Sequence, residues 1–445
     1  MHMPSTSNQS PLFNRPAELL QQLIRFDTTN PPGNEAECIS YIHYLLTEAG
    51  IHTTILARDP MRPNLVARLT GQGNAPALLL QGHVDVVTTE HQQWQHPPFA
   101  GIAADGYIWG RGTLDMKGGV AMMLAAFLRA KAESLPVSGD VVLAVVSDEE
   151  VGSEYGAKYL IENHVDLFKG VRYALGEVGG FTIHIGGRKF YPIMVAEKQG
   201  CLVKATVRGP GGHGSLPFHG GAMAKLGVLL LQLDQHRLPV HIPTVTRLMI
   251  EAIAADLPSP IGSLLDQLLD PTRTDSILGK LGPQGMFFDP VLHNTVNATI
   301  VHGGEKSNVI PSKIVLEMDG RILPGYGSDD LLTELHQLAG DDVEIDVKPA
   351  EPAPAEPDMA LFDTLGDILR EADPDGIPVP YLLPAVTDAR FFTQLGIQTY
   401  GFLPMKLPGG FDFSQTIHAA NERIPVEAME FGTNAIYEVL RRFGR

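Results

Sequence analysis

Cysteine is scarce in this chain, which has 445 residues and only two cysteines, Cys38 and Cys201. Two cysteines so far apart provide neither a disulfide framework nor a CxxC pair. Basic residues are also few, because 33 lysines and arginines stand against 51 aspartates and glutamates, giving a formal net charge of −18. Such a charge argues against nucleic acid and anionic membranes as partners. The low cysteine content fits a reducing cytosol, so we expect a cytoplasmic protein. The charge predicts that it binds neither nucleic acid nor an anionic membrane.

Long apolar runs and nucleotide-binding motifs are missing as well. No stretch of about 18 apolar residues occurs, so no transmembrane helix is expected. The chain has no GxGxxG fingerprint, and the glycine-rich stretch GPGGHGS at 209–215 lacks the lysine that a phosphate loop needs. What is present is a 44% share of hydrophobic residues, enough for a large core divided between two or three domains.

Hydrophobic periodicity predicts strands that alternate with helices in the first part of the chain. Buried strands are expected at 77–81, 141–146 and 171–176, and helices at 15–26, 34–49, 118–133 and 153–163. This alternation is typical of an α/β sheet with helices on both faces.

The pattern changes near residue 196. Strands and helices are then expected in the order βαββαβ, a ferredoxin-like unit, at 198–209, 221–236, 293–302, 313–322, 328–338 and 343–348. A partly helical insertion at 244–290 interrupts this unit, and the Pro/Ala/Glu-rich stretch 349–358 follows it. The sequence therefore predicts one α/β domain, formed by 1–196 and 353–445, that is split by an α+β domain at 197–352.

Acids and histidines gather where the predicted strands end. His83 and Asp85 follow the strand at 77–81, Glu149 and Glu150 follow 141–146, and Glu177 follows 171–176. In an open α/β sheet, ligands bind outside the carboxyl ends of the strands. Asp115 and His418, both in loops, are further candidates. Because clustered carboxylates repel one another, and imidazole and carboxylate ligands suit zinc, manganese or cobalt, we expect two divalent metal ions here.

Each residue taken alone has a simpler explanation. His83 and Asp85 could form a capped loop, the two glutamates a solvated turn, Asp115 a helix N-cap, and His418 a structural histidine. These explanations do not account for the gathering of acids at the ends of several strands.

Four longer motifs occur in a specific order along the chain: GHVDVV (82–87), GRGTLDMKGG (110–119), SDEEVG (147–152) and HAANE (418–422). Together they resemble the aminoacylase, glutamate carboxypeptidase and succinyl-diaminopimelate desuccinylase family of dinuclear zinc hydrolases, metallopeptidase family 20. Shorter stretches agree, including FDTTNPPG (26–33), NVIPSK (308–313), DGRILPG (319–325) and TDAR (387–390). The resemblance implies a zinc-peptidase-like α/β catalytic domain with an inserted ferredoxin-like lid or dimerisation domain.

The resemblance also implies a set of metal ligands. His83 and Glu177 would bind one metal ion, Glu150 and His418 the other, and Asp115 would bridge both. Asp85 would hold the His83 ring by accepting its free N–H. A cis peptide bond after Asp115 is a further feature of such proteins.

Roles in the reaction follow from the same resemblance. Glu149 would be the general base. His213 would stabilise the oxyanion, from the neighbouring subunit in dimeric relatives, unless it is only a histidine in a flexible glycine loop. Arg321 would bind a substrate carboxylate or, equally, would only pair with Asp319. Asn308 and Thr387 are weaker candidates for substrate contacts.

The expected reaction is the cleavage of an amide bond in an N-acyl amino acid or a small peptide with a free carboxylate. Hydrolysis of another small amide, carbamoyl or formyl, is an alternative, and a metal-stabilised binding protein without catalysis is a second. A homodimer is expected through the inserted domain, on the argument that the strand at 198–209 is an exposed edge. Two departures from the family bear on this: Pro384, Ala385 and Val386 stand where relatives often have glycines, and the 244–290 insertion is long.

Overall fold

The computed structural model describes residues 10–340, 342–349 and 353–445. It divides the chain into two compact units. Unit 1 comprises Met1–Val195, Asp358–Pro380 and Thr387–Arg445, and unit 2 comprises Ala196–Pro357 and Tyr381–Val386. The boundary expected at 352 lies outside the described residues. The short segment Tyr381–Val386, which the sequence assigned to the catalytic domain, belongs to unit 2.

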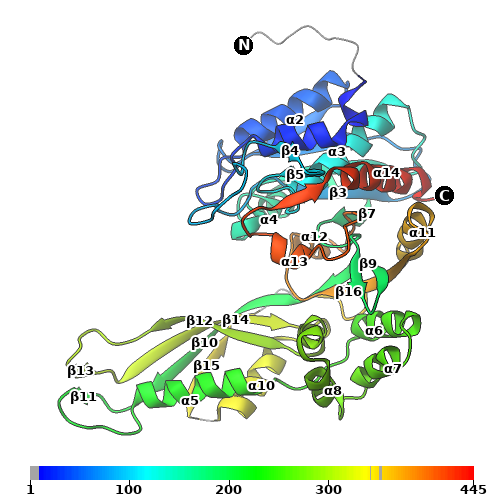
Figure 1. Cartoon of the computed structure of the whole chain (residues 1–445). Helices are drawn as coiled ribbons and strands as arrows, with labels where there is room; N and C mark the ends of the chain where they lie inside the picture. The colour runs from blue at the N-terminus through cyan, green and yellow to red at the C-terminus, as the bar shows by residue number, and fades with distance from the viewer. Residues whose placement is uncertain (1–9, 341, 350–352) are drawn as a thin grey trace. The chain divides into compact units, whose positions relative to one another are not determined.

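Unit 1 is built on a mixed nine-stranded sheet in the order β1-β2-β6-β3-β7-β17-β9-β16, with β8 added beside β9 (Figure 1). Its strands are β1 (Thr53–Leu56), β2 (Asn64–Leu69), β3 (Ala77–His83), β6 (Val141–Val146), β7 (Val171–Gly176), β8 (Ile183–Ile185), β9 (Arg188–Glu197), β16 (Gly376–Leu383) and β17 (Gln398–Gly401). The neighbouring strands β6, β3, β7 and β17 are parallel. Every residue of β3 and β6 is buried, which explains their almost unbroken apolar sequences.

The helices of unit 1 cover this sheet. They are α1 (Pro16–Ile24), α2 (Ala36–Glu48), α3 (Lys117–Ala132), α4 (Ala157–Asn163), α11 (Phe362–Ala372), α12 (Ala389–Thr393), α13 (Phe413–Thr416) and α14 (Val426–Arg442). Helix α3 is almost wholly buried and packs against α1 and α14. Its first turn contains Gly118, where a β-carbon would lie 2.1 Å from the carbonyl oxygen of Thr113, so only glycine fits there.

A small three-stranded sheet in unit 1 joins distant parts of the chain. It consists of β4 (Ile102–Ala104), β5 (Tyr107–Trp109) and β18 (Arg423–Pro425), in the order β18-β5-β4. Because β18 pairs with β5, the HAANE loop that precedes β18 lies beside the loop that carries Asp115.

Unit 2 has a four-stranded antiparallel sheet in the order β12-β14-β10-β15. Its elements follow the chain as β10 (Gln199–Arg208), α5 (Ala222–Gln235), β12 (Thr295–His302), β14 (Lys313–Ile322), α10 (Ser328–Ala339) and β15 (Val343–Val347). Both helices pack on the same face of the sheet, around a core that includes Val203, Leu226, Leu316 and Leu331. The βαββαβ order and antiparallel pairing confirm the ferredoxin-like α+β prediction.

The insertion between α5 and β12 is helical. It contains α6 (Thr244–Asp256), α7 (Ile261–Asp266), α8 (Thr274–Leu281) and α9 (Asp289–Leu292), with short 3-10 turns between them. Its own buried residues, among them Met249, Ile253 and Leu268, form a small core.

One strand expectation is wrong. The strand predicted at 198–209, now β10, is not an edge, since it pairs with β14 on one side and β15 on the other. The strands at the edges of this sheet are β12 and β15. None of the helices in the described ranges combines the length and apolar character that a membrane span requires.

Candidate metal centre

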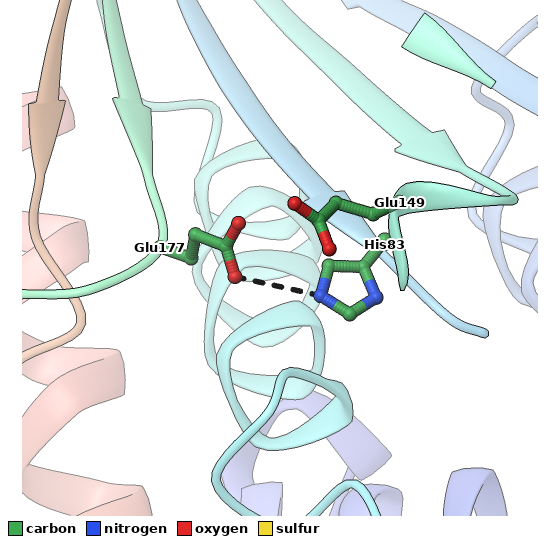
Figure 2. Close-up of side chains that lie close together, drawn as sticks. All are labelled: His83, Glu149 and Glu177. Atoms are coloured by element: carbon green, nitrogen blue, oxygen red, sulfur yellow. Dashed lines mark ion pairs between the residues drawn. The ribbon is translucent and has the colours of Figure 1, made fainter. Parts of the chain in front are cut away.

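Three neighbouring parallel strands bring side chains to one edge of the unit 1 sheet. His83 is the last residue of β3 and lies opposite Val146, the last residue of β6. Glu149 and Glu150 follow β6 after a two-residue turn, and Glu177 comes directly after β7. Figure 2 shows His83, Glu149 and Glu177 facing one another across these strand ends. The cluster therefore lies at the strand ends where the sequence predicts it.

Asp115 lies between the two histidines. Its Oδ1 is 3.1 Å from Nε2 of His83, and its Oδ2 is 3.1 Å from Nε2 of His418. Each histidine also faces a second carboxylate: His83 Nε2 is 3.4 Å from Glu177 Oε2, and His418 Nε2 is 3.3 Å from Glu150 Oε2. The five side chains thus form two groups that share Asp115. The peptide bond between Asp115 and Met116 is cis.

Glu149 lies next to the first of these groups. Ligand atoms of His83, Glu149 and Glu177 fall within 4.8 Å of one another, as do those of His83, Asp115 and Glu150. Glu149 is thus close enough to the cluster to take part in chemistry there, or to bind a metal itself.

Asp85 is fully buried and organises several neighbours. His83 donates from Nδ1 to the backbone carbonyl of Asp85 at 3.0 Å, while the carboxylate oxygen Oδ1 is farther away, at 3.4 Å. The Asp85 carboxylate accepts instead the backbone N–H groups of Glu149 (3.1 Å) and Glu150 (3.2 Å). One aspartate therefore fixes the His83 ring and also the turn that carries both glutamates.

Asp148, which lies within the SDEEVG motif, holds the start of the same turn. Its φ of 71° lies in the left-handed region, which aspartate tolerates better than most residues. Its carboxylate accepts from Asn30 (3.0 Å), from Arg62 (2.9 Å) and from the backbone N–H of Tyr155 (3.0 Å). The turn after β6 is thereby pinned from both sides.

A buried ion pair anchors the other loops. Arg111 and Glu422 are both almost inaccessible to solvent, and Nη1 of Arg111 lies 2.6 Å from Oε2 of Glu422. Glu422 accepts the backbone N–H groups of Leu114 (2.8 Å) and Asp115 (3.3 Å), and Arg111 donates to the backbone carbonyl of His418 at 3.1 Å. The pair therefore fixes the backbone at both Asp115 and His418.

The sequence reasoning did not single out Asn30, Arg62, Arg111 or Glu422. Three of them lie within motifs that it quoted, FDTTNPPG, GRGTLDMKGG and HAANE. Their sequence signal was that each is a polar residue, without an assigned role, inside a motif that resembles the family.

Crowding perturbs the protonation of these groups. Burial raises the pKa of Glu177 to about 7, and burial also raises the pKa of Glu149 well above its usual value. Hydrogen bonds to Asp115 and Glu150 raise the pKa of His418 to about 10. Burial would lower the pKa of His83, but Asp115, Asp85 and Glu177 raise it well above its usual value. The cluster without a cation therefore retains protons at neutral pH.

The donor set fits divalent metal ions. Imidazole nitrogens and carboxylate oxygens are the ligands that zinc, manganese and cobalt share. Glu150 Oε1 is buried and has no hydrogen-bond partner in the described part of the chain. An unpaired buried carboxylate oxygen is costly unless something binds it. A cation between these groups would satisfy that oxygen and relieve the repulsion between the acids.

Three of the predicted substrate residues lie in unit 2. Arg321 donates to Asp319 through Nε (3.2 Å) and Nη2 (3.1 Å), as the ion-pair alternative expects. Its Nη1, however, is buried with no hydrogen-bond partner in the described ranges, near Gly200. His213 and Asn308 are exposed neighbours, since the backbone N–H of Gly214 donates to the Asn308 carbonyl at 2.8 Å.

Thr387 belongs to unit 1 and is buried. Its hydroxyl accepts the backbone N–H of Ala389 at 3.0 Å. The next residue, Asp388, accepts from Ser153 in the segment after Glu150. The TDAR stretch therefore lies beside the turn that carries the glutamates.

Imidazoles and carboxylates that gather at the carboxyl ends of parallel strands in an α/β sheet are typical of a metal-dependent hydrolase. The comparison with protein families gives the same class and narrows it. The chain belongs to peptidase family M20/M25/M40, whose family model matches residues 79–442. This confirms the resemblance read from the four motifs.

Relatives and solved structures agree with the family. Human N-fatty-acyl-amino acid synthase/hydrolase PM20D1 is 29% identical over 391 residues, which cover 84% of this chain and 76% of that protein. Succinyl-diaminopimelate desuccinylase of Paracoccus denitrificans is 38% identical over 148 residues, 33% of this chain and 38% of that protein.

Among solved structures, the M20 family metallo-carboxypeptidase Sso-CP2 from Sulfolobus solfataricus has a TM-score of 0.68 at 17% identity, covering 96% of this chain and 99% of that one. The YXEP protein of Bacillus subtilis, described as a dinuclear metal-binding peptidase, has a TM-score of 0.60 at 13% identity, covering 97% of each chain. These two likenesses confirm the fold.

Proposed function

We propose that the protein is a co-catalytic dinuclear metallohydrolase that cleaves the amide bond of an N-acyl amino acid or a small peptide with a free carboxylate. The observation that carries the proposal is Asp115, whose two carboxylate oxygens each face a histidine and so provide two metal positions with a common ligand. His83 and Glu177 would hold one ion, and His418 and Glu150 the other.

Zinc is the proposed metal, with manganese and cobalt as alternatives for the same donors. Two bound ions supply Lewis acidity at the amide carbonyl and at the attacking water. Glu149 accepts a proton from that water and passes it to the nitrogen of the leaving amine. Burial favours this role, because it raises the pKa of Glu149 and so makes the group a stronger base.

Substrate recognition is proposed for three residues of unit 2, Arg321, His213 and Asn308, and for Thr387 of unit 1. Asp319 orients the Arg321 guanidinium by accepting from one side of it, and Nη1 remains to donate to a substrate carboxylate. His213 stabilises the oxyanion, while Asn308 and Thr387 contact the substrate. The names of the relatives, which mention N-fatty-acyl amino acids, a succinyl group and carboxypeptidases, support acyl-amino acids and peptides as the substrate class.

A homodimer through unit 2 is also proposed, now on a different surface from the one read in the sequence. The edge strand β12 has exposed Ile300 and Val301. Helix α5 exposes an apolar stripe of Met223, Val228 and Leu231. A second copy of this chain, adding its β12 and α5, would cover both. The cytoplasmic location stays a prediction that rests on two free cysteines.

The test is Glu149→Gln, assayed with zinc, manganese and cobalt on N-acyl amino acids and dipeptides. We expect metal content to stay near that of the parent while turnover falls by roughly 10²–10⁴. The matched control is Glu154→Gln, a surface glutamate five residues away that pairs with Lys158 and Arg58. Full activity in Glu149→Gln would refute the mechanism.

The same panel separates the alternatives. Cleavage of carbamoyl or formyl amides in preference to acyl-amino acids would assign another small amide as substrate. No hydrolysis of any amide by the metal-loaded parent protein would leave only a metal-stabilised binding protein.

A further inference from the structure

The FDTTNPPG stretch has no role in the proposed function, yet it runs beside the loop that carries Asp85. The Thr28 hydroxyl donates to the carbonyl of Val84 at 2.6 Å, and the N–H of Val86 donates to the carbonyl of Thr28 at 3.1 Å. The N–H of Asn30 then donates to the carbonyl of Val86 at 2.9 Å. The backbone of Asn30 is thus fixed against both sides of Asp85.

The side chain of Asn30 connects two acids that are far apart in sequence. Its amide nitrogen donates to Asp85 Oδ2 at 2.9 Å and to Asp148 Oδ1 at 3.0 Å. A primary amide has two hydrogens, one for each acid. All three side chains are at most 4% exposed, so water does not compete for these bonds.

These two acids determine where Glu149 lies. Asp148 precedes Glu149 in a left-handed conformation, and Asp85 accepts the backbone N–H of Glu149. Two buried carboxylates would repel each other if nothing joined them. Arg62 pairs with Asp148 and with Glu35, and among the described residues no hydrogen bond or ion pair joins it to Asp85. Asn30 is therefore the group that holds the two acids together.

We infer that Asn30 is a positioning residue for the general base: by bridging Asp85 and Asp148, it fixes the turn that aims Glu149 at the substrate. This inference rests on the proposed function, in which Glu149 moves the proton. The side-chain hydrogen bonds of Asn30 in the described part of the chain go to Asp85 and Asp148 and not to a proposed metal ligand, so its expected contribution to turnover passes through the position of Glu149.

The test combines Asn30→Ala with Glu149→Gln in the full chain, with turnover measured at saturating zinc and expressed per metal-loaded chain. In the parent background Asn30→Ala is expected to lower kcat about 10- to 100-fold, the usual cost of losing a partner of this kind, with KM unchanged. In the Glu149→Gln background the same substitution should lower kcat less than 2-fold, because the group it positions is already gone.

The matched control is Asn294→Ala. Asn294 is a buried amide in unit 2 that donates to Glu334 and accepts the N–H of Leu323. Its loss should lower stability and should have the same effect on kcat in both backgrounds. Where Asn30→Ala fails to fold, Asn30→Ser takes its place, since a hydroxyl keeps one donor in the site.

A kcat loss at least 5-fold larger in the parent than in the Glu149→Gln background supports the inference, and any smaller difference overturns it. A folded variant that cannot be loaded with zinc also overturns it, because Asn30 would then act on the metal ligands. If Glu149→Gln alone keeps full activity, the proposed function fails first. If Glu149→Gln is impaired and Asn30→Ala is not, only the role of Asn30 falls.

Discussion

Metal binding to this cluster should release a defined number of protons. A ligand must be deprotonated before it binds a metal ion. In the metal-free protein the pKa of His418 is about 10 and that of His83 is well above its usual value, so both rings carry an extra proton at pH 7. Each ring must lose one proton to become a ligand, which accounts for two.

Glu177 adds a fraction that depends on pH. Because burial raises its pKa to about 7, it is half protonated at pH 7 and releases about half a proton more. Asp115 adds none: burial would raise its pKa, but His418 and His83 hold it below the usual range. Burial also raises the pKa of Glu150, the remaining proposed ligand, so any proton that it holds adds to the release. The expected release is therefore more than two protons per chain at pH 7, and it should increase as the pH falls toward 5.5.

The assay is a pH-stat titration of zinc into chelator-stripped protein. His418→Ala should release about one proton fewer than the parent, because one cationic ring has been removed. His213→Ala is the control and should release the parental number, since His213 lies in unit 2 and belongs to neither metal group. A release below one proton per chain at pH 7, or an equal release from the two variants, would refute the ligand assignment.

Three further predictions concern stability, specificity and assembly. The free energy of unfolding of the metal-free protein should fall between pH 5 and pH 8, because Glu177 and His418 have pKa values above those of the unfolded chain and keep protons that the unfolded chain has lost. The slope is about 1.4 kcal/mol per pH unit for each proton that the folded state binds and the unfolded chain does not. Denaturant titrations with zinc present should lack this fall, and a flat metal-free profile would contradict it. Arg321→Ala should raise KM about 10- to 100-fold for substrates with a free carboxylate and leave C-terminally amidated ones unchanged; equal effects on both would assign the arginine to its ion pair alone. Val228→Asp should yield a monomer in sedimentation velocity with a Tm close to that of the parent, whereas Met286→Asp, at a side chain 75% exposed in the helical insertion, should not change the mass; a monomeric parent would remove the proposed dimer.

Much of the architecture could be predicted because a buried strand or helix face has a regular pattern of apolar residues in the sequence. The strands β3 and β6 are apolar at nearly every position since both of their faces are covered. Three strands of the same sheet, β8, β9 and β16, were not predicted. Strands β9 and β16 contain proline, at Pro192 and at Pro378 and Pro380, and proline normally argues against a strand. In the structure β16 ends the sheet, the position where proline is tolerated.

The position of a strand within its sheet was harder to predict. The alternating pattern of β10 shows that one of its faces is buried, but hydrogen bonding to neighbours on both sides leaves no mark on that pattern. For the same reason the edge strand β12 could not be recognised from its sequence.

The candidate site divides in a similar way. The sequence located the residues that carry charge at strand ends, such as His83 and Glu177. It did not locate Asn30, Arg62 or Glu422, which act through hydrogen bonds to residues between 27 and 311 positions away. A neutral amide or a buried ion pair has no distinctive local pattern, so only the folded chain shows what it contacts.

The discontinuity of unit 1 has a consequence for synthesis. Strand β17 pairs with β7, but it follows β7 by more than 200 residues, and all of unit 2 is made in between. At roughly 5–20 residues per second, a ribosome needs about 10–45 s to reach β17 after β7 has been made. During that time the edge of β7 that β17 will occupy has no partner from this part of the chain, a state in which strands pair wrongly or are bound by chaperones. His418 and Glu422 emerge later still, so a nascent chain that already holds His83, Asp115 and both glutamates of the turn lacks one of the five proposed metal ligands and the buried partner of Arg111.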